Sequence, residues 1–399
     1  MKIIYISPIK LSSKKGEATH FLEVAKRLED LGDTLIMICR QGEKELPNSN
    51  IRNIPNINIP YLTTFITEVL LSAYLMFFVK TLRPNVVFYR GLMSGGIICR
   101  IFGIPSVAEA NGIYPDEIKM QRPLFFGVVG PILKLRERIL YCSATKVICV
   151  TNGIKRELTR GYGVAGGKCE VVPNGVNISL FKPCNKMVCR RALEFDENTF
   201  YLGFVGSFQP WQGLDTLIQA LTIVKERNCR HMKCVLVGDG DEMESLKRMV
   251  NLNSLQNEII FKGRVEYEDV PALINSFDVC LAPFKRQRNA KIGLSPLKLY
   301  EYLACAKPVI ATRTEGVTEV IEESNCGYLF DADDANALAL KIIQCFNERD
   351  ILEKLGNNGR LFVKEKFSWE VIAQRVKEIF KDITEGSERM RFIENAQHK

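Results

Sequence analysis

Residues 291–312, KIGLSPLKLYEYLACAKPVIAT, combine side chains that could bind a phosphorylated ligand. Ser295 and Pro296 stand just before an expected helix, where serine is a natural N-cap and proline fits the first turn. Backbone amides at the start of that helix could hold a diphosphate, and Lys298 adds positive charge. Glu301 could accept two hydrogen bonds from ribose hydroxyls. The residue types leave open a second interpretation, an ordinary surface ion pair between Lys298 and Glu301.

A second candidate phosphate loop is GSFQPWQG, residues 206–213, which follows the apolar run YLGFV and precedes a helical pattern. Gly206 and Gly213 would let the backbone approach a ligand closely, and a helix start suits phosphate. The spacing is not GxGxxG, so the dinucleotide-binding fingerprint is absent. A tight strand-to-helix turn without any ligand is the alternative.

Polar residues also follow two apolar, strand-like runs in the first half of the chain. Tyr89 and Arg90 end one run, and Glu109 and Asn111 end the next. Ligands of open parallel sheets bind beyond the carboxyl ends of the strands. We therefore expect these four residues to face a cleft between two domains and to shape an acceptor or sugar site. Polar loop residues that only cap the sheet are the alternative.

The sequence gives no reason to expect a metal site. Asp239 and Asp241 form a DxD pair, but a helix pattern begins there, so N-capping explains them better. The 13 cysteines include no CxxC pair and several lie in apolar runs, which indicates buried free thiols in a reducing compartment.

The elements that would position these residues alternate between strand and helix along 399 residues, a length typical of two domains. The strand-like runs are continuously apolar, which indicates parallel sheets covered on both faces. We expect an N-terminal Rossmann-like domain over residues 1–172 and a second one over 173–367. A final helix over 368–385 and a polar tail over 386–399 complete the prediction.

The run LKLYEYLACAKPVIAT closely resembles the motif K-x-x-E-Y-x-A-x-x-K-P-V of family 4 retaining glycosyltransferases. VVPNGVNISLFKP, VGSFQPWQGLDTLIQA, VLVGDG, FKGRV, FDVCLAP and FSWE are similar to further motifs of that family, in the same order. Together they cover roughly residues 145–385, and a subgroup reading S-P-x-K-x-x-E-Y is the nearest pattern. The resemblance implies the α/β GT-B fold, with two facing Rossmann-like domains and a last helix that crosses back to the N-terminal domain.

The resemblance also implies residue roles. Glu301 would bind the donor ribose, with Lys298 beside the diphosphate, and both would act in catalysis with Glu109 and Asn111 at the acceptor side. The family's N-terminal glycine-rich loop makes Gly16 and His20 acceptor or cleft candidates, together with Tyr89 and Arg90. The residues expected to bind the donor are Gly206, Ser207, Gln212, Gly213, Arg264, Val265, Gly293, Leu294, Ser295, Pro296, Leu297 and Glu301.

Two positions depart from the family pattern. Many members carry a glutamate eight residues before the one that matches Glu301, where this chain has Gly293. Many also carry a basic residue before the glycine that matches Gly213, where this chain has Gln212. The first departure leaves the paired-glutamate motif incomplete, and the second removes one expected diphosphate contact.

The net charge and the apolar segments indicate which classes of partner, nucleic acid or membrane, to expect. The net charge is +8, yet no zinc-finger spacing, aromatic RNA-binding motif or dense basic helix is present, so we expect no nucleic acid partner. Two apolar segments with basic flanks, residues 61–83 and 119–140, could lie on an anionic membrane surface. Ordinary buried helices with snorkelling basic side chains are the alternative.

These observations predict a retaining glycosyltransferase that moves a sugar from a UDP- or GDP-sugar to a glycan or lipid-linked acceptor. We expect it to work in the cytoplasm, at the inner face of the membrane, in cell-surface polysaccharide or glycoconjugate synthesis. No cofactor beyond the nucleotide-sugar donor and no metal is expected. Two alternatives stay open: a nucleotide-sugar epimerase of the same fold, and a non-catalytic nucleotide-sugar-binding subunit of a membrane assembly.

Overall fold

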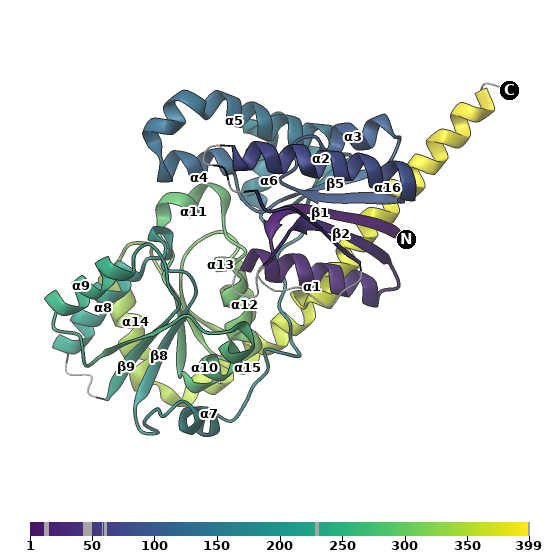
Figure 1. The fold of residues 1–399 in the computed structure, drawn as a ribbon. Coiled ribbons are helices and arrows are strands. Elements are labelled where there is room, and N and C mark those ends of the chain that lie inside the picture. The colour runs from purple at the N-terminus through teal and green to yellow at the C-terminus, as the bar shows by residue number, and fades with distance from the viewer. Residues whose placement is uncertain (12–15, 43–49, 58, 60–61, 228–230, 398–399) are drawn as a thin grey trace. The chain divides into compact units, whose positions relative to one another are not determined.

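The chain folds into two compact units (Figure 1). The structure is a computed structural model that describes all residues except 12–15, 43–49, 58, 60–61, 228–230 and 398–399, with the backbone alone for 17, 121, 288 and 387–397. Unit 1 consists of Met1–Pro173 together with Glu370–Lys399, and unit 2 of Asn174–Trp369.

Unit 1 is built on a parallel sheet with the strand order β3-β2-β1-β4-β5-β6-β7 in the described part of the chain. Its central strands are buried along nearly their whole length, as a sheet covered on both faces requires. The strands are β1 (Lys2–Lys10), β2 (Thr34–Arg40), β3 (Ile51–Ile54), β4 (Val86–Arg90), β5 (Ser106–Ala110), β6 (Lys146–Cys149) and β7 (Cys169–Val171).

The helices of unit 1 lie on both faces of this sheet. Helices α2, α3 and α5 pack together on one face, and α1 lies on the other (Figure 1). The helices are α1 (Gly16–Asp30), α2 (Thr63–Leu82), α3 (Gly95–Ile101), α4 (Tyr114–Gln121), α5 (Pro123–Ser143), α6 (Asn152–Gly161) and α16 (Trp369–Gln397).

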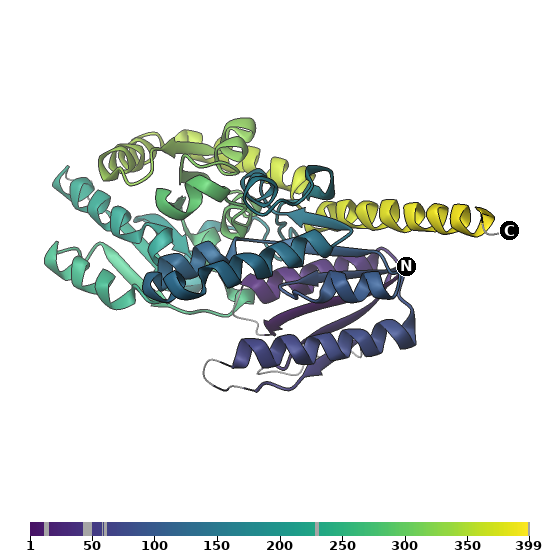
Figure 2. The ribbon, with the colours of Figure 1, turned by 90° about the horizontal axis from the view of Figure 1, so that it is seen from above.

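Helix α16 belongs to unit 1 although it ends the chain. The Phe380 ring packs against the Phe88 ring of β4 at 5.4 Å between centroids, and the Lys377 ammonium donates to the Leu31 carbonyl at 2.6 Å. The helix runs on to Gln397 (Figure 2), so the prediction that it ends at residue 385 and gives way to a tail is wrong. Gly386 is the one glycine in that stretch, and a helix tolerates a single glycine at about 1 kcal/mol.

Helix α2 is the one described helix that is long and apolar enough, by length and composition, to cross a membrane. One side of α2 packs inside unit 1. Its buried residues are Thr67, Leu71, Leu75 and Val79.

Unit 2 repeats the architecture on a parallel sheet of order β10-β9-β8-β11-β12-β13. Its strands are β8 (Phe200–Val205), β9 (Met232–Val237), β10 (Ile259–Gly263), β11 (Val279–Ala282), β12 (Val309–Thr312) and β13 (Gly327–Phe330). Its helices are α7 (Lys186–Ala192), α8 (Leu214–Glu226), α9 (Met243–Leu252), α10 (Val270–Ser276), α11 (Arg286–Ile292), α12 (Leu297–Ala304), α13 (Thr318–Ser324), α14 (Ala335–Asn347) and α15 (Arg349–Lys366).

Strand β8 shows how the sheet of unit 2 separates two apolar layers. Phe200, Leu202 and Phe204 enter the layer formed with α8, α9 and α14. Tyr201 and Val205 enter the opposite layer, formed with α10 and α12. This alternation follows from the two-residue period of a strand, and it leaves the loops after the strands free to carry function.

Candidate active site

The loop after β8 is shaped around a lysine side chain. Gly206 has φ +148°, and a Cβ at this position would lie 2.5 Å from the Lys298 ammonium. Gly213, at the start of α8, has φ +71°, and a Cβ there would overlap the Pro283 carbonyl oxygen. Both conformations favour glycine, so the two glycines are needed for close packing of this loop.

Lys298 lies half-buried among apolar and neutral groups. Its ammonium is 3.8 Å from the centre of the Phe204 ring and donates to Gln212 Oε1 at 2.7 Å. Burial lowers the pKa of Lys298 to about 7, and the nearby Glu301 only partly opposes this shift. Gln212, the departure from the family pattern, therefore supplies an acceptor to the lysine where a basic residue would repel it.

Glu301 is buried one turn further along α12. Its Oε1 accepts a hydrogen bond of 3.4 Å from the Tyr267 hydroxyl, and burial raises the pKa of Glu301 to about 7. Because Glu301 is buried and Lys298 donates to Gln212, the interpretation of the two as a surface ion pair is wrong.

Ser295 and Pro296 lie at the start of α12 but in other roles than predicted. Pro296 occupies the N-cap position and makes no side-chain cap, so neither serine capping nor proline in the first turn is observed. The Ser295 hydroxyl instead accepts from the Asn174 amide at 2.8 Å and pairs with the Tyr300 hydroxyl at 3.1 Å. Asn174 also donates through its side chain to the Ser295 carbonyl at 2.6 Å. Sequence reasoning missed Asn174, although it lies in the conspicuous turn Pro-Asn-Gly.

Gly293 and Leu294 join α11 to α12 and pack on a neighbouring loop. Gly293 has φ +67°, and a Cβ there would lie 3.1 Å from the Glu315 carbonyl. The Leu294 amide donates to that same carbonyl at 2.9 Å. A side chain at 293 would be strained, so this backbone path itself accounts for the glycine in place of the family's glutamate.

The remaining predicted donor residues follow β8 and β10. Ser207 is exposed, and Val265 packs on the apolar layer beside α10 and α12. Arg264 is exposed and lies 3.6 Å from Asp239 in an ion pair. The prediction that the Asp239–Asp241 pair caps a helix is wrong, since Glu242 holds the N-cap position of α9. In the described residues, no group of three or more His, Cys, Asp or Glu residues is arranged to hold a metal ion.

A separate buried cluster lies in unit 1. His20 Nε2 and Glu109 Oε1 are 2.5 Å apart, and the Tyr5 hydroxyl donates to Glu109 Oε2 at 3.4 Å. Burial acts to raise the pKa of Glu109, but the His20 charge and hydrogen bond, helped by Arg90, outweigh it and lower that pKa. The structure thus joins two residues that lie 89 positions apart and that the sequence suggested independently.

The other unit 1 candidates differ in their placement. Asn111 Oδ1 is buried and has no hydrogen-bond partner among the described residues, so it can accept from a ligand. Gly16 is the first residue of α1, and most of the loop before it lies outside the described residues. Tyr89 was expected in a cleft, which is wrong: it is fully buried and its hydroxyl donates to the Leu140 carbonyl at 2.9 Å. Alternation along β4 directs its ring towards Gly95 of α3.

Two family descriptions match the chain. "Glycosyltransferase Family 4" matches residues 15–180, and "Glycosyl transferases group 1" matches residues 185–362. An uncharacterized glycosyltransferase of Methanocaldococcus jannaschii is 25% identical over 93% of this chain and 95% of its own length.

The protein is a glycosyltransferase.

Solved structures agree with this assignment in their fold. Sucrose-phosphate synthase from Thermosynechococcus elongatus matches the glycosyltransferase with a TM-score of 0.80 at 20% identity, covering 97% of this chain and 100% of that one. HepE from Anabaena, in complex with UDP-glucose, matches with a TM-score of 0.73 at 19% identity, covering 96% and 100%. The predicted GT-B fold with parallel sheets is confirmed.

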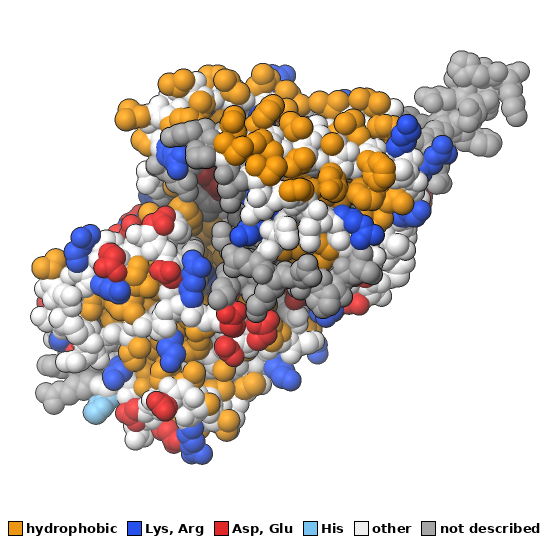
Figure 3. Space-filling view, in the orientation of Figure 1, with side chains coloured by type: hydrophobic (Ala, Val, Ile, Leu, Met, Phe, Trp, Pro, Cys, Tyr) orange, Lys and Arg blue, Asp and Glu red, His pale blue; other side chains and the backbone are white. Residues whose placement is uncertain are grey.

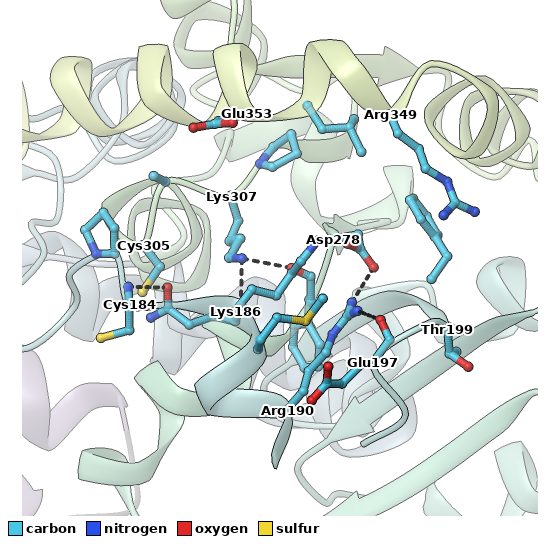
Figure 4. Close-up of a pocket in the computed structure, with 18 of the residues that line it drawn as sticks. Cys184, Lys186, Arg190, Glu197, Thr199, Asp278, Cys305, Lys307, Arg349 and Glu353 are labelled. Carbon is cyan, nitrogen blue, oxygen red and sulfur yellow. Dashed lines mark hydrogen bonds and ion pairs between the residues drawn. The ribbon is translucent and has the colours of Figure 1, made fainter. Parts of the chain in front are cut away.

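The glycosyltransferase also has a cavity of about 610 Å³ in unit 2 (Figure 4), away from the loops described above. It lies at the amino ends of β8, β11 and β12, the opposite edge of the sheet. Four of the charged residues that line it are engaged with one another or with the backbone: Asp278 pairs with Arg190 at 2.6 Å and with Lys186 at 2.7 Å, and Lys307 donates to two backbone carbonyls. The position and the satisfied charges both argue against a donor site here.

Proposed function

We propose that the glycosyltransferase takes its sugar from a UDP- or GDP-sugar bound by unit 2 and transfers it, with retention, to a glycan or lipid-linked acceptor. The observation that carries this proposal is the Lys298 ammonium, held under Gly206 at the start of α12. Solved structures of the same fold bind UDP and UDP-glucose.

The chemistry of the loops supports a diphosphate here. The first turn of α12 leaves backbone N–H groups without helical partners, and these suit phosphate oxygens. A diphosphate beside Lys298 would restore the charge that burial suppresses, and the charged lysine would stabilise the departing nucleoside diphosphate. The Glu301 carboxylate would accept the ribose hydroxyls.

The acceptor belongs to unit 1 in this proposal. Asn111 offers a buried acceptor atom, and the His20–Glu109 pair lies at the carboxyl end of β5 in the same unit. No described side chain serves as an evident nucleophile, so the leaving phosphate itself would accept the acceptor's proton. We place this reaction in the cytoplasm, in cell-surface polysaccharide or glycoconjugate synthesis, with no metal or further cofactor.

Neither alternative is favoured by an observation. The two departures from the family pattern, Gln212 and Gly293, would favour a non-catalytic subunit if they disabled the donor site. Gln212 instead binds Lys298, and Gly293 fits a backbone that only glycine adopts easily. An epimerase would need an acid and a base placed at the sugar, whereas Lys298 and Glu301, the described pair of unit 2 whose pKa values lie near 7, are assigned in this proposal to the diphosphate and the ribose.

A thermal-shift and calorimetric screen of UDP-, GDP- and ADP-sugars tests the donor site. We expect one nucleotide class to stabilise the protein, and Glu301→Ala to weaken its binding by roughly 10- to 100-fold through lost ribose hydrogen bonds. Glu353→Ala, an exposed change on α15, is the control and should bind as the parent does. A folded protein that no nucleotide sugar stabilises would contradict the proposal.

A further inference from the structure

Unit 1 exposes a contiguous apolar face on helices α2, α3 and α5 (Figure 3). Helix α3 contacts both α2 and α5. We call this surface the apolar face. The most exposed side chains are Leu124, Val128 and Ile132 of α5, at 91%, 81% and 69%. Its large apolar residues are Phe65, Val69, Met76, Phe77, Ile97, Ile101, Leu124, Phe125, Val128, Ile132 and Leu135. A patch spread over three helices is far more than scattered surface residues and marks an interaction site.

Helix α2 shows that the exposure is not a by-product of core formation. Its inner side already carries the buried residues Leu71, Leu75 and Val79. Phe65, Val69 and Met76 form a second apolar stripe on the outer side, at helical spacing. A helix at the surface of a globular protein ordinarily has a polar outer side, so the apolar residues here need a partner.

The exposed charged side chains on the three helices of the apolar face are all of one sign. Every exposed charged side chain described on α2, α3 and α5 is basic: Lys80, Arg100, Lys134 and Arg138. The two carboxylates of these helices, Glu68 and Glu137, are turned inward and pair with Arg136 at 3.3 and 3.1 Å. The outer surface therefore combines apolar side chains with uncompensated positive charge.

We propose that the apolar face inserts into the headgroup region of a bilayer that contains anionic lipids. Basic side chains and apolar side chains on one surface match the phosphates and the acyl boundary of such a bilayer. Helix α2 lies along the surface and does not cross it, because crossing would take its buried side out of unit 1. Two copies joined through this face would bring like charges together, which disfavours a dimer.

The membrane contact is coupled to the candidate acceptor residues through Arg136. Its guanidinium donates to the Gly91 carbonyl at 2.6 Å, directly after Arg90 at the end of β4. Helix α5 is thus fixed to the loop that directly follows Arg90. This inference goes beyond the proposed function and supplies a reason for it to use a lipid-linked acceptor.

Flotation of the purified full chain with phosphatidylcholine vesicles, with and without phosphatidylglycerol, tests this proposal. We expect strong binding only with the anionic lipid. Val128→Asp combined with Ile132→Asp should weaken binding on the order of 100-fold, since both side chains lose their burial in lipid. Lys134→Gln with Arg138→Gln should weaken binding to anionic vesicles about 30-fold.

The matched control is Leu252→Asp with Leu361→Asp, two equally exposed apolar residues of unit 2. It should bind vesicles as the parent does, and thermal unfolding should show that all variants fold. Absent vesicle binding, or binding that the double aspartate variant retains, would overturn the proposal. A lipid-free dimer that the double aspartate variant converts to a monomer would also overturn it. The vesicle assay contains no sugar donor. A failure of the membrane proposal would therefore not bear on the proposed donor site.

Discussion

Lys298 and Glu301, three residues apart on α12, are both pushed towards their neutral forms by burial. The pKa of Lys298 is lowered to about 7 and that of Glu301 is raised to about 7. A bound nucleotide diphosphate sugar would reverse both shifts, since phosphate favours charged lysine and ribose hydroxyls favour the carboxylate. Binding should therefore take up a proton at Lys298 and release one at Glu301.

Single variants should separate these two titrations. In Glu301→Gln only Lys298 titrates, and its pKa is higher in the bound state, so donor affinity should rise as the pH falls through about 7. In Lys298→Met only Glu301 titrates, and its pKa is lower in the bound state, so affinity should rise as the pH increases through about 7. Calorimetric titrations across this range measure both slopes. Slopes of the same sign in the two variants would contradict the assigned roles.

At the scale of elements, the path from α11 to α12 should reject the glutamate that the family usually carries there. Gly293→Glu would place a side chain at φ +67° and against the Glu315 carbonyl. We expect it to lower the free energy of unfolding by about 1–3 kcal/mol and not to raise turnover. Urea unfolding measures this effect.

Gly386→Glu is the control for that change. Gly386 lies within helix α16 with open space around it, so glutamate there should be neutral or stabilising by up to about 1 kcal/mol. A Gly293→Glu variant that is as stable as the parent and more active would contradict this. The backbone conformation would then not explain why the chain has glycine where the family usually has glutamate.

The elements that carry the donor loops could be predicted because their patterns are local. The apolar run of β8, the glycines after it and the helix that carries Glu301 are each readable within a short stretch. The contact of His20 with Glu109 could not be predicted from a local pattern, because it depends on β1 and β5 both lying beside β4. Tyr89 was wrongly expected in a cleft. Strand alternation divides the side chains of β4 between two faces, but it does not show which face is covered by α3 and α5. Strand β3 could not be predicted either, because its short, half-exposed run IRNI has no clear period.

At the scale of the whole molecule, the last helix completes the first unit, so the two ends of the chain stabilise one body. Phe380→Ala removes a fully buried ring that packs on Phe88. We expect a loss of about 3–5 kcal/mol in the stability of unit 1. Hydrogen exchange should show lost protection in β1 and β4 while unit 2 keeps its protection.

Phe200→Ala, in β8, is the matched control, since it removes a buried ring from unit 2 instead of unit 1. Its ring is equally buried in the core of unit 2, so the loss of protection should appear there instead. Equal loss in both units from either change would contradict the division into two units.

The central claim is that Lys298 and the start of α12 hold the diphosphate of a sugar donor during transfer. The most direct test measures nucleoside diphosphate release from the stabilising donor, with an acceptor extract present, for the parent, Lys298→Met and Lys354→Met. Lys354 is an exposed lysine of α15 and serves as the control. We predict that acceptor-dependent release falls about 100- to 1,000-fold in Lys298→Met alone, because the leaving charge loses its cation. Unchanged release in Lys298→Met, or none from a folded parent that binds the donor, would contradict the account.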